Sequence, residues 1–462
     1  MRFAKRALAL AAAFVLPAGA APDPLAAIAA ANGHPAEHRL RVSGSGTYEG
    51  RRIVETLDRE GVTFLDRRCV AEVCAGTWFD GTRTWKFGLN DVTLPEDDGH
   101  AAVRRTLAAI VSFAFAEPAF RAAGGTVEPA GNAAWRVRAR GGDALIAELD
   151  PATFALRRVL DERGAAIGAF GREVRAGGAA VPLEQRGLDG GSFQTAEAPA
   201  GPLRPPAGAP ATFSGDPAAA LSGESLPIVP CSLGGRPVRC LLDTGATPSA
   251  IVLPLAEALR LEPRGELEIT AFSRFATGFV ETGPLVVGSA HVAAARFAVI
   301  PPVAEARFDV VIGADLLARF RVVFDRAHRR AQILPPGGPP APGAIALRFA
   351  GGVPRVDATL DARAADALFD SGDAAIVSLG YGDYRAGPQW PLAERAQAAG
   401  VAGASDAFIV TIPAVAVGPV ALGAVRATVG RTQAGVHVGI GIWSRCVVEL
   451  DEASETLRCN AR

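Results

Sequence analysis

Apolar and polar residues alternate in short runs over most of the chain, and a period of two residues predicts β-strands. The pattern is regular between residues 38 and 90, where one face of the first expected strand carries Leu40, Val42, Gly44, Gly46 and Tyr48. Further strands are expected at residues 135–139, 145–149 and 156–160. The chain is therefore predicted to be mainly β.

Two stretches in the first half have a helical pattern instead. Residues 23–33 begin with Asp23, a favoured N-cap, and end with Gly33, a residue that often follows a helix. The mostly apolar residues 101–115 precede Pro118, which does not continue a helix. For residues 22–195 the economical arrangement is a curved antiparallel sheet with a helix packed against it.

Two short segments share a rarer pattern, in which two apolar residues run into an aspartate, a hydroxyl residue and a glycine. They are Leu241-Leu242-Asp243-Thr244-Gly245 and Leu368-Phe369-Asp370-Ser371-Gly372. The apolar pair suits a buried strand, and the glycine permits a tight turn. Because a carboxylate at the end of a buried strand is costly unless it is paired or used, the two aspartates are candidate functional residues.

The surroundings of these two segments repeat as well. Residues 229–243 can be laid over residues 356–370 without a gap, and both copies read as two strands joined by a turn. An apolar-apolar-glycine segment follows in each copy: Gly313 lies 70 residues after the first aspartate, and Gly439 lies 69 residues after the second. A unit repeated with matched spacing indicates a duplicated lobe.

Segments rich in proline, alanine and glycine divide the chain, because such segments favour linkers and surface straps. The predicted organisation is a signal peptide at residues 1–21, an N-terminal β-rich accessory domain at 22–195, a linker at 196–225, a first lobe at 226–334, an inter-lobe linker at 335–344 and a second lobe at 345–462.

The first 21 residues have the pattern of an export signal. A charged start precedes an apolar run that is too short to span a bilayer, and Ala18-Gly19-Ala20 forms a small-residue cleavage site. The six cysteines fall into neighbouring pairs, which suits disulfides in an oxidising compartment. The expected pairs are Cys69 with Cys74, Cys231 with Cys240, and Cys446 with Cys459. We therefore expect an exported protein, periplasmic or secreted, with no transmembrane segment.

Composition narrows the classes of function. The 462 residues carry a formal net charge of −1 and no basic block, which argues against a nucleic-acid partner. No metal or other cofactor is expected, because the histidines are scattered and no cysteine pair has Cys-x-x-Cys spacing. Each histidine is predicted to be a surface or packed residue; they are His34, His38, His100, His291, His328 and His437.

The two Asp-Thr/Ser-Gly segments and their later apolar-apolar-glycine segments resemble the aspartic protease superfamily over roughly residues 222–462. The length of each copy is similar to a retropepsin lobe, and two lobes on one chain are similar to pepsin. The resemblance implies a two-lobe body of closed β-barrels, in which Asp243 and Asp370 approach one water molecule. It also implies an aspartic endopeptidase acting on a peptide or protein substrate.

Asp243 and Asp370 are thus the expected catalytic pair. Two carboxylates this close share one proton, so the ionised one takes a proton from water and the protonated one donates to the scissile carbonyl. The resemblance gives six residues supporting roles: Thr244 and Ser371 hydrogen-bond to the facing loop, Gly245 and Gly372 let backbone amides approach the carboxylates, and Gly313 and Gly439 let a strand pack behind each loop. It assigns no substrate-binding residue.

Some features depart from the family pattern or stand beside it. Asp373 stands where the family usually has Ala, Ser or Thr. If it lies near the pair and is ionised, it raises the pKa values of the two aspartates and moves the activity optimum toward neutral pH. If it points to solvent, it only caps a turn. The flap-like hairpin expected over residues 266–282 lacks the pepsin-type tyrosine, and Phe272 or Phe275 is the candidate to cover the cleft. Asp315 is expected to be structural rather than a third catalytic carboxylate.

Two other functions stay open from the sequence. One is a non-catalytic envelope binding protein with a relic protease body. The other is a retropepsin-like homodimer that uses Asp243 from two chains and leaves the second lobe structural.

The N-terminal domain has a separate resemblance. Its turns at Phe79-Asp80-Gly81 and Leu149-Asp150-Pro151 are similar to those of carriers of the lipoprotein-sorting type. This resemblance implies a cavity for an apolar ligand, an acyl chain or a peptide, and a scaffold or docking domain is the alternative.

Overall fold

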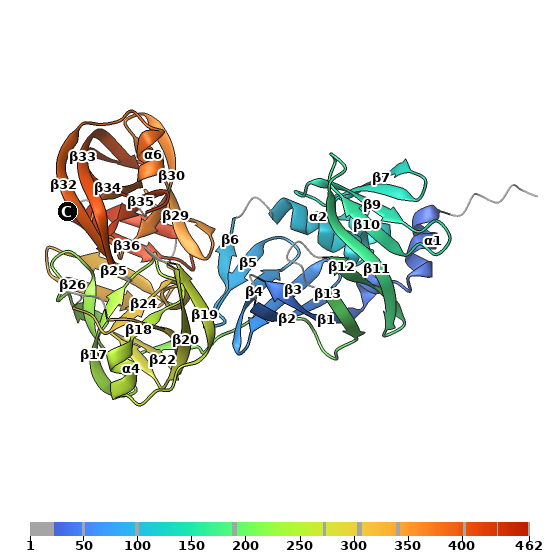
Figure 1. Ribbon diagram of the computed structural model, residues 1–462, viewed down its shortest axis with the longest axis horizontal. Helices are drawn as coiled ribbons and strands as arrows, with labels where there is room; N and C mark the ends of the chain where they lie inside the picture. The colour runs from blue at the N-terminus through green and yellow to red at the C-terminus, as the bar shows by residue number, and fades with distance from the viewer. Residues whose placement is uncertain are drawn as a thin grey trace, which may run out of the picture.

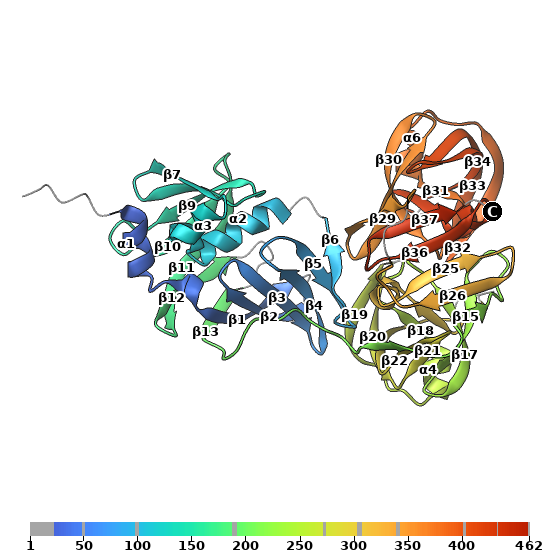
Figure 2. The same cartoon turned by 180° about the vertical axis from the view of Figure 1, so that it is seen from behind.

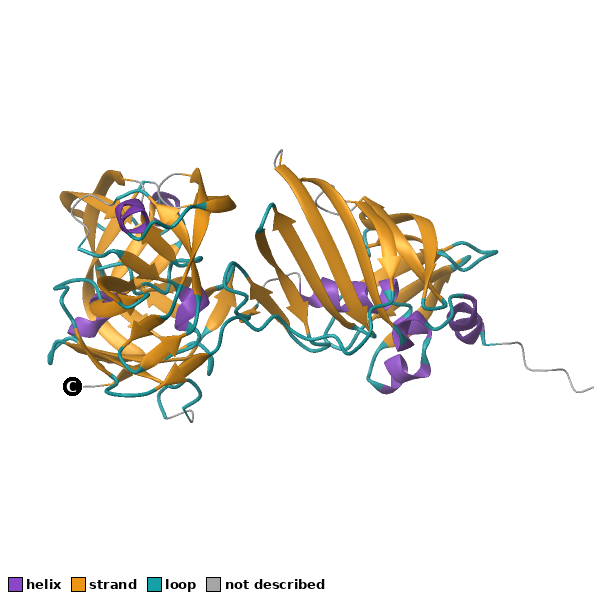
Figure 3. Ribbon diagram, turned by 90° about the horizontal axis from the view of Figure 1, so that it is seen from below, coloured by secondary structure: helices purple, strands orange, loops and turns teal. Residues whose placement is uncertain are grey.

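The computed structural model describes residues 23–48, 51–97, 101–186, 192–270, 274–302, 307–338, 342–400, 403–431 and 433–460. The expected signal peptide at residues 1–21 lies outside the described residues, as does Phe272 in the expected flap hairpin. The described chain is mainly β, as predicted, with short helices beside large sheets (Figure 3). An N-terminal part lies beside a body of two stacked lobes (Figures 1 and 2).

Two antiparallel sheets and a few helices form the N-terminal part, because alternating apolar positions let each sheet bury one face. The first sheet has the order β13 (Ser192–Glu197), β1 (Arg39–Tyr48), β2 (Arg51–Glu60), β3 (Thr63–Val70), β4 (Val73–Phe79), β5 (Thr84–Phe87) and β6 (Leu94–Glu96). The second has the order β12 (Ala179–Arg186), β11 (Ala166–Ala176), β10 (Leu156–Leu160), β9 (Ala144–Leu149), β8 (Ala134–Arg138) and β7 (Thr126–Gly131).

Helices pack on the second sheet and complete its core. They are α1 (Pro24–Ala31), α2 (Ala101–Val111), α3 (Pro118–Ala122) and the 3₁₀ turns η1 (Pro35–Glu37) and η2 (Ala114–Ala116). As expected, Asp23 caps α1 by accepting a hydrogen bond from the amide of Leu25. The helix predicted over residues 101–115 ends at Val111, since the backbone of Phe113 is left-handed. Pro118 begins a further helix rather than ending one, because proline fits the first helical turn.

The body contains three sheets. The first lobe has β14 (Ala211–Phe213), β22 (Ala290–Val292), β21 (Leu285–Val287), β16 (Ile228–Leu233), β17 (Arg236–Leu242), β24 (Val310–Ile312), β18 (Ala250–Val252), β23 (Ala295–Ile300), β20 (Arg274–Thr282) and β19 (Arg264–Thr270), in this order. The second lobe has β28 (Arg348–Ala350), β29 (Val353–Leu360), β30 (Arg363–Asp370), β35 (Val436–Gly439), β31 (Val377–Gly380), β34 (Val420–Gly430), β33 (Gly403–Val417) and β32 (Leu392–Gly400).

A third sheet joins the two lobes. Its order is β15 (Ala218–Ala220), β26 (Arg330–Leu334), β25 (Arg321–Asp325), β36 (Val447–Asp451), β37 (Thr456–Asn460) and β27 (Ile345–Ala346). Strand β25 of the first copy pairs antiparallel with β36 of the second. The short helices of the body are α4 (Leu253–Ala258), α5 (Ala314–Leu317), α6 (Tyr381–Arg385) and η3 (Ile440–Ser444). The two sequence copies therefore form corresponding strands: β17 and β24 of the first lobe match β30 and β35 of the second, and β25 matches β36.

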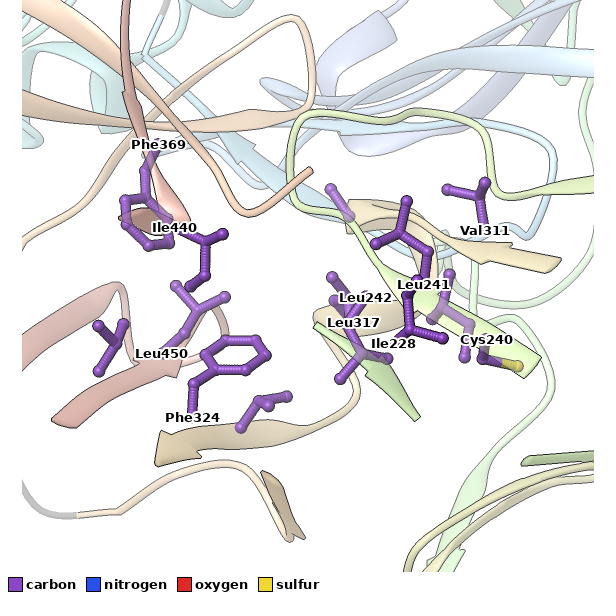
Figure 4. Close-up of a cluster of buried hydrophobic side chains, with 14 of the residues drawn as sticks. Ile228, Cys240, Leu241, Leu242, Val311, Leu317, Phe324, Phe369, Ile440 and Leu450 are labelled. Atoms are coloured by element: carbon purple, nitrogen blue, oxygen red, sulfur yellow. The ribbon is translucent and has the colours of Figure 1, made fainter. Parts of the chain in front are cut away.

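One hydrophobic cluster runs through both lobes and carries the two aspartate segments. Of the four apolar residues before the aspartates, Leu241, Leu242 and Phe369 are buried in this cluster (Figure 4), and Leu368 is half-buried. Strand β17 pairs in parallel with β24, and β30 pairs in parallel with β35. Each aspartate therefore stands at the end of a strand fixed on both sides, and this fixed frame sets where its carboxylate points.

The segment at residues 196–225, expected to be a linker, also supplies two strands to the sheets of the body. Strand β14 within it pairs with β22, and β15 pairs with β26. Two short runs of small or apolar residues thus cover open edges of the body's sheets, where free backbone groups otherwise lack partners.

The three expected cysteine pairs are confirmed. Disulfides join Cys69 to Cys74, Cys231 to Cys240, and Cys446 to Cys459. The first two disulfides link paired antiparallel strands, and the third links Cys446, directly before β36, to Cys459 on the paired strand β37. No helix among the described residues is long and apolar enough to cross a membrane.

Candidate active site

The two aspartates are held in the same way by their own loops. The amide of Gly245 donates to Asp243 Oδ1 at 3.0 Å, and the amide of Gly372 donates to Asp370 Oδ1 at 2.9 Å. The amide of Asp243 donates in turn to the carbonyl of Ile312 at 2.9 Å. In each loop, therefore, the glycine two residues after the aspartate holds one carboxylate oxygen in place.

The hydroxyl residues lock the two loops together. The Thr244 amide donates to Ser371 Oγ at 2.9 Å, and the Ser371 amide donates to Thr244 Oγ1 at 2.9 Å. The Thr244 hydroxyl then donates to the carbonyl of Phe369 at 2.6 Å, and the Ser371 hydroxyl to that of Leu242 at 2.8 Å. Both hydroxyl residues are fully buried. We call these four hydrogen bonds the interlock; they fix one loop against the other.

The loop glycines leave room for the facing carboxylate. A Cβ atom placed on Gly245 would lie 2.5 Å from the carboxyl group of Asp370, and one on Gly372 would lie 2.4 Å from that of Asp243. No side chain fits at either position without displacing a carboxylate. The carboxyl group of each aspartate therefore lies against the glycine of the other loop.

Glycines behind the loops act in the same symmetric way. A Cβ on Gly313 would lie 2.4 Å from the Ala246 carbonyl oxygen, and one on Gly439 would lie 2.3 Å from that of Ala375. The expected close packing of a strand behind each loop is what this geometry requires. The backbone after Gly313 also bonds to the first loop, since the amide of Ala314 donates to the Ala246 carbonyl at 2.9 Å.

The surroundings of Asp243 disfavour the ionised form of its carboxyl group. Burial raises the pKa of Asp243 well above its ordinary value, and the charge of Asp370 and a hydrogen bond with it raise it further. The amides of Gly245 and Ala246 oppose this rise. The pair therefore holds a proton at a pH where an exposed aspartate is fully ionised.

Asp373 lies close to the pair and also caps a turn. Its Oδ1 accepts a hydrogen bond from the Ala375 amide at 2.9 Å. Burial raises its pKa, and the charge of Asp370 raises it further, while a hydrogen bond from Ser378 opposes the rise. Asp373 thus combines both sequence-based interpretations, except that it points inward rather than to solvent.

A histidine beside the pair was not predicted from the sequence. His437 Nδ1 lies 3.3 Å from Asp370 Oδ2, whereas the sequence predicts only a surface or packed histidine at this position. Burial lowers the pKa of His437, whereas the hydrogen bond with Asp370 and the charges of Asp370 and Asp373 raise it. The raising effects are larger together, so the pKa of His437 lies above its ordinary value. The repeat carried a signal for it, because His437 aligns with the apolar Val311 of the first copy.

Asp315 is structural, as expected. Its Oδ1 accepts hydrogen bonds from the amide and hydroxyl of Ser249 at 2.9 and 2.6 Å, and its Oδ2 accepts from Asn90 Nδ2 at 2.7 Å. The Ser249 hydroxyl accepts in turn from the amide of Gly313 at 2.9 Å. A continuous buried chain of hydrogen bonds thus leads from the N-terminal part to the back of the first aspartate loop.

The hairpin of β19 and β20 occupies the position expected for the flap-like segment. Phe275 lies opposite Ile269 in this hairpin and packs against the core of the lobes. Arg51 of the N-terminal part forms ion pairs with Glu266 and Glu268 on β19, at 3.1 and 3.2 Å. The N-terminal part therefore holds the outer strand of this hairpin.

Within the described residues, one group of three side chains has the spacing of metal ligands. It consists of His34, Glu37 and Glu117, and His34 Nδ1 lies 2.8 Å from Glu117 Oε1. The group belongs to the N-terminal part and has no share in the aspartate pair.

Comparison with known families bears on the first copy. Residues 229–316 match the family model described as "Aspartyl protease", and the matched segment includes Asp243, Thr244, Gly245 and Gly313. None of the curated proteins matches the chain. Over this segment the chain is similar to the aspartyl protease family.

Proposed function

We propose that this protein is an exported aspartic endopeptidase that hydrolyses peptide bonds with Asp243 and Asp370 as its catalytic pair. The observation that carries this proposal is the interlock, which puts both carboxylates of one chain beside each other's loop glycine. The raised pKa of Asp243 supports a shared proton between them. The similarity of residues 229–316 to aspartyl proteases supports a hydrolase acting on peptides or proteins.

In the proposed reaction one water molecule lies between the two carboxyl groups. The ionised carboxylate takes a proton from this water as its oxygen attacks the scissile carbonyl carbon, and the protonated carboxyl donates its proton to the carbonyl oxygen. The resulting tetrahedral intermediate collapses when the first carboxyl returns a proton to the leaving nitrogen and the second recovers its proton from a hydroxyl group. Each carboxyl thereby regains its starting state.

The supporting residues fix the distance on which this reaction depends. Thr244 and Ser371 hold the loops at one separation, and Gly245 and Gly372 let the carboxylates face each other. A preorganised pair acts without rearranging at the moment of reaction, and this accounts for a large part of the rate in enzymes of many kinds.

The interlock also favours a single-chain site over the two alternatives. A homodimer using Asp243 from two chains requires Thr244 to give up Ser371 of its own chain and the buried hydrogen bonds between them. Burying two neighbouring carboxyl groups destabilises the fold. A relic protease body that only binds does not require this pair, so its presence favours a catalytic role.

Export is proposed from the leader pattern at residues 1–21, and three disulfides are compatible with an oxidising compartment. For the N-terminal part, a docking role is supported by its contacts with both lobes. Besides the ion pairs of Arg51 to β19, the Asp97 amide donates to the Phe349 carbonyl at 2.8 Å, and the Phe349 amide donates to Asp97 Oδ2 at 3.0 Å.

The test is incubation of the exported chain with a mixed peptide library, followed by mass spectrometry of the products. The proposal predicts cleavage by the wild type and by Asp406→Asn, a control at an exposed aspartate of the second lobe. It predicts no cleavage by the double variant Asp243→Asn/Asp370→Asn. Equal product from wild type and double variant, or none from the wild type between pH 3 and 8, refutes it.

A further inference from the structure

His437 is placed by its strand to face one aspartate of the pair. It lies on β35, opposite Leu368 of β30 and Ser378 of β31. Its side chain is 19% exposed and that of Asp370 is 17% exposed, so both are largely screened from water. The Nδ1 atom lies 3.3 Å from Asp370 Oδ2, the oxygen that the Gly372 amide does not bond.

The second ring nitrogen fixes where the hydrogen of the neutral ring sits. His437 Nε2 lies 3.2 Å from the carbonyl oxygen of Ala434, and a carbonyl only accepts hydrogen bonds, so Nε2 carries a hydrogen. A neutral ring would therefore turn a bare Nδ1 toward the carboxylate of Asp370. Two acceptors repel at this distance, so a proton lies on one of them. It lies on the imidazole, since histidine is the stronger base, with ordinary pKa values of about 6.5 and 3.9.

The surroundings of the ring favour this charged form. Among the described residues, the charged groups acting on His437 are Asp370 at the end of β30 and Asp373 in the loop after it. The residue facing it from β31 is Ser378, which is neutral. Two carboxylates therefore stabilise one imidazolium, and its pKa is raised despite burial.

The first lobe has neither of these charges. The position of His437 is taken there by Val311, which is buried beside Leu241, and the position of Asp373 is taken by Ala246. The additional acid and the additional base occur together, in the second lobe alone. The pair is therefore symmetric in its backbone and asymmetric in its charge.

We infer that His437 is a positioning residue of the catalytic pair: as an imidazolium bound to Asp370, it keeps that carboxylate ionised and leaves the shared proton on Asp243. The inference rests on the proposed function and gives each aspartate a fixed part in it. Asp370 takes the proton of the attacking water and later passes it to the leaving nitrogen. Asp243 donates to the carbonyl oxygen and recovers its proton when the intermediate collapses. His437 stays protonated throughout.

A titration of the histidine side chains tests the pairing without relying on activity. Proton–nitrogen NMR spectra of the full chain are recorded from pH 4 to 9, and the His437 signal is identified by its loss in His437→Gln. The inference predicts a pKa above about 6.5 in the wild type and a lower value in Asp370→Asn. A wild-type pKa at or below 6.5, or one unchanged in Asp370→Asn, overturns it.

Cleavage measured against pH tests the effect on the pair. Removing the imidazolium makes the aspartates harder to ionise, so in His437→Val the acid limb of kcat moves up by about 1–2 pH units with little change in KM. In Asp373→Ala the acid limb moves down, because a negative charge is lost. His437→Gln repeats the first test without the charge, should the valine variant fold poorly.

The control is His328→Gln, which removes an exposed histidine paired with Asp325 at 2.7 Å and should leave the pH profile unchanged. An acid limb in His437→Val and His437→Gln that coincides with that of the control overturns the positioning role. A wild type that cleaves nothing refutes the proposed function, and the NMR titration then still decides whether His437 and Asp370 form the pair.

Discussion

Replacing Ser371 by alanine tests whether the interlock holds the two loops. The change removes one hydroxyl that makes two buried hydrogen bonds, accepting from the Thr244 amide at 2.9 Å and donating to the Leu242 carbonyl at 2.8 Å. Both partners are left buried and unpaired, and each unpaired group costs about 1–3 kcal/mol. The sum is about 2–6 kcal/mol for opening this part of the body.

Hydrogen exchange read by mass spectrometry measures this cost at the site itself. A tenfold change in an equilibrium corresponds to about 1.4 kcal/mol, so exchange of the Thr244 amide should be faster by about 30-fold or more in Ser371→Ala. The control is Ser222→Ala, an exposed serine whose hydroxyl donates to the Ile228 carbonyl; the Ser222 amide also donates to this carbonyl and is kept in the variant, so a change within about 0.5 kcal/mol is expected.

The opposite variant, Thr244→Val, leaves the Ser371 amide and the Phe369 carbonyl unpaired and should cost a similar amount. The double variant should cost less than the sum, because the loops are already released once either hydroxyl is lost. Exchange of the Thr244 amide in Ser371→Ala that matches the Ser222→Ala control would refute the interlock.

Three further predictions concern a buried glutamate, a loop glycine and the contact between Asn90 and Asp315. Glu452 is fully buried, neither of its carboxylate oxygens has a partner in the described part of the chain, and burial, with the charge of Asp315, raises its pKa. The folded chain thus keeps a proton that the unfolded chain releases above about pH 4.3. The free energy of unfolding therefore falls by about 1.4 kcal/mol per pH unit from that value up to the raised pKa of the folded state. Urea unfolding measured from pH 5 upward should show that Glu452→Gln removes this part of the pH dependence. Gly372→Ala puts a methyl group about 2.4 Å from the carboxyl of Asp243, so thermal unfolding should show a loss of about 1–3 kcal/mol and cleavage should fall with it; unchanged kcat contradicts this. Asn90→Ala leaves an oxygen of Asp315 unpaired, and calorimetry should show the first lobe destabilised by about 1–3 kcal/mol, whereas an unchanged transition argues against the buried chain of hydrogen bonds.

The aspartate loops could be predicted because their signal is local and repeated. An apolar pair, an aspartate, a hydroxyl and a glycine specify a buried strand that ends in a tight turn, and Leu241 and Phe369 are buried as this pattern requires. The matched distance to Gly313 and Gly439 then indicated which strands pass behind the loops. The disulfides could be predicted because their signal is also local: the two strands of a hairpin bring neighbouring cysteines together, as for Cys231 and Cys240.

What could not be predicted depends on contacts between distant segments. A lone histidine in a strand reads as a packed residue, and only the parallel pairing of β35 with β30 sets His437 beside Asp370. The residues of β14 and β15 were predicted to be part of a linker, and they form strands instead. Short runs of small residues become strands only where the edge of a sheet is free to pair with them, and the sequence does not show where such an edge lies. The hydrogen bond from Asn90 to Asp315 likewise joins residues that no local pattern connects.

The central claim is that two carboxylates of one chain form one hydrolytic site, and comparing the two single variants tests it most directly. Cleavage rates are measured for Asp243→Asn, for Asp370→Asn and for an equal mixture of the two. We predict that each variant loses about 10²–10⁴-fold in kcat and that the mixture recovers nothing, because neither chain contains both carboxylates. Activity retained by Asp370→Asn, or restored by mixing, would contradict the claim and indicate a site shared between two chains.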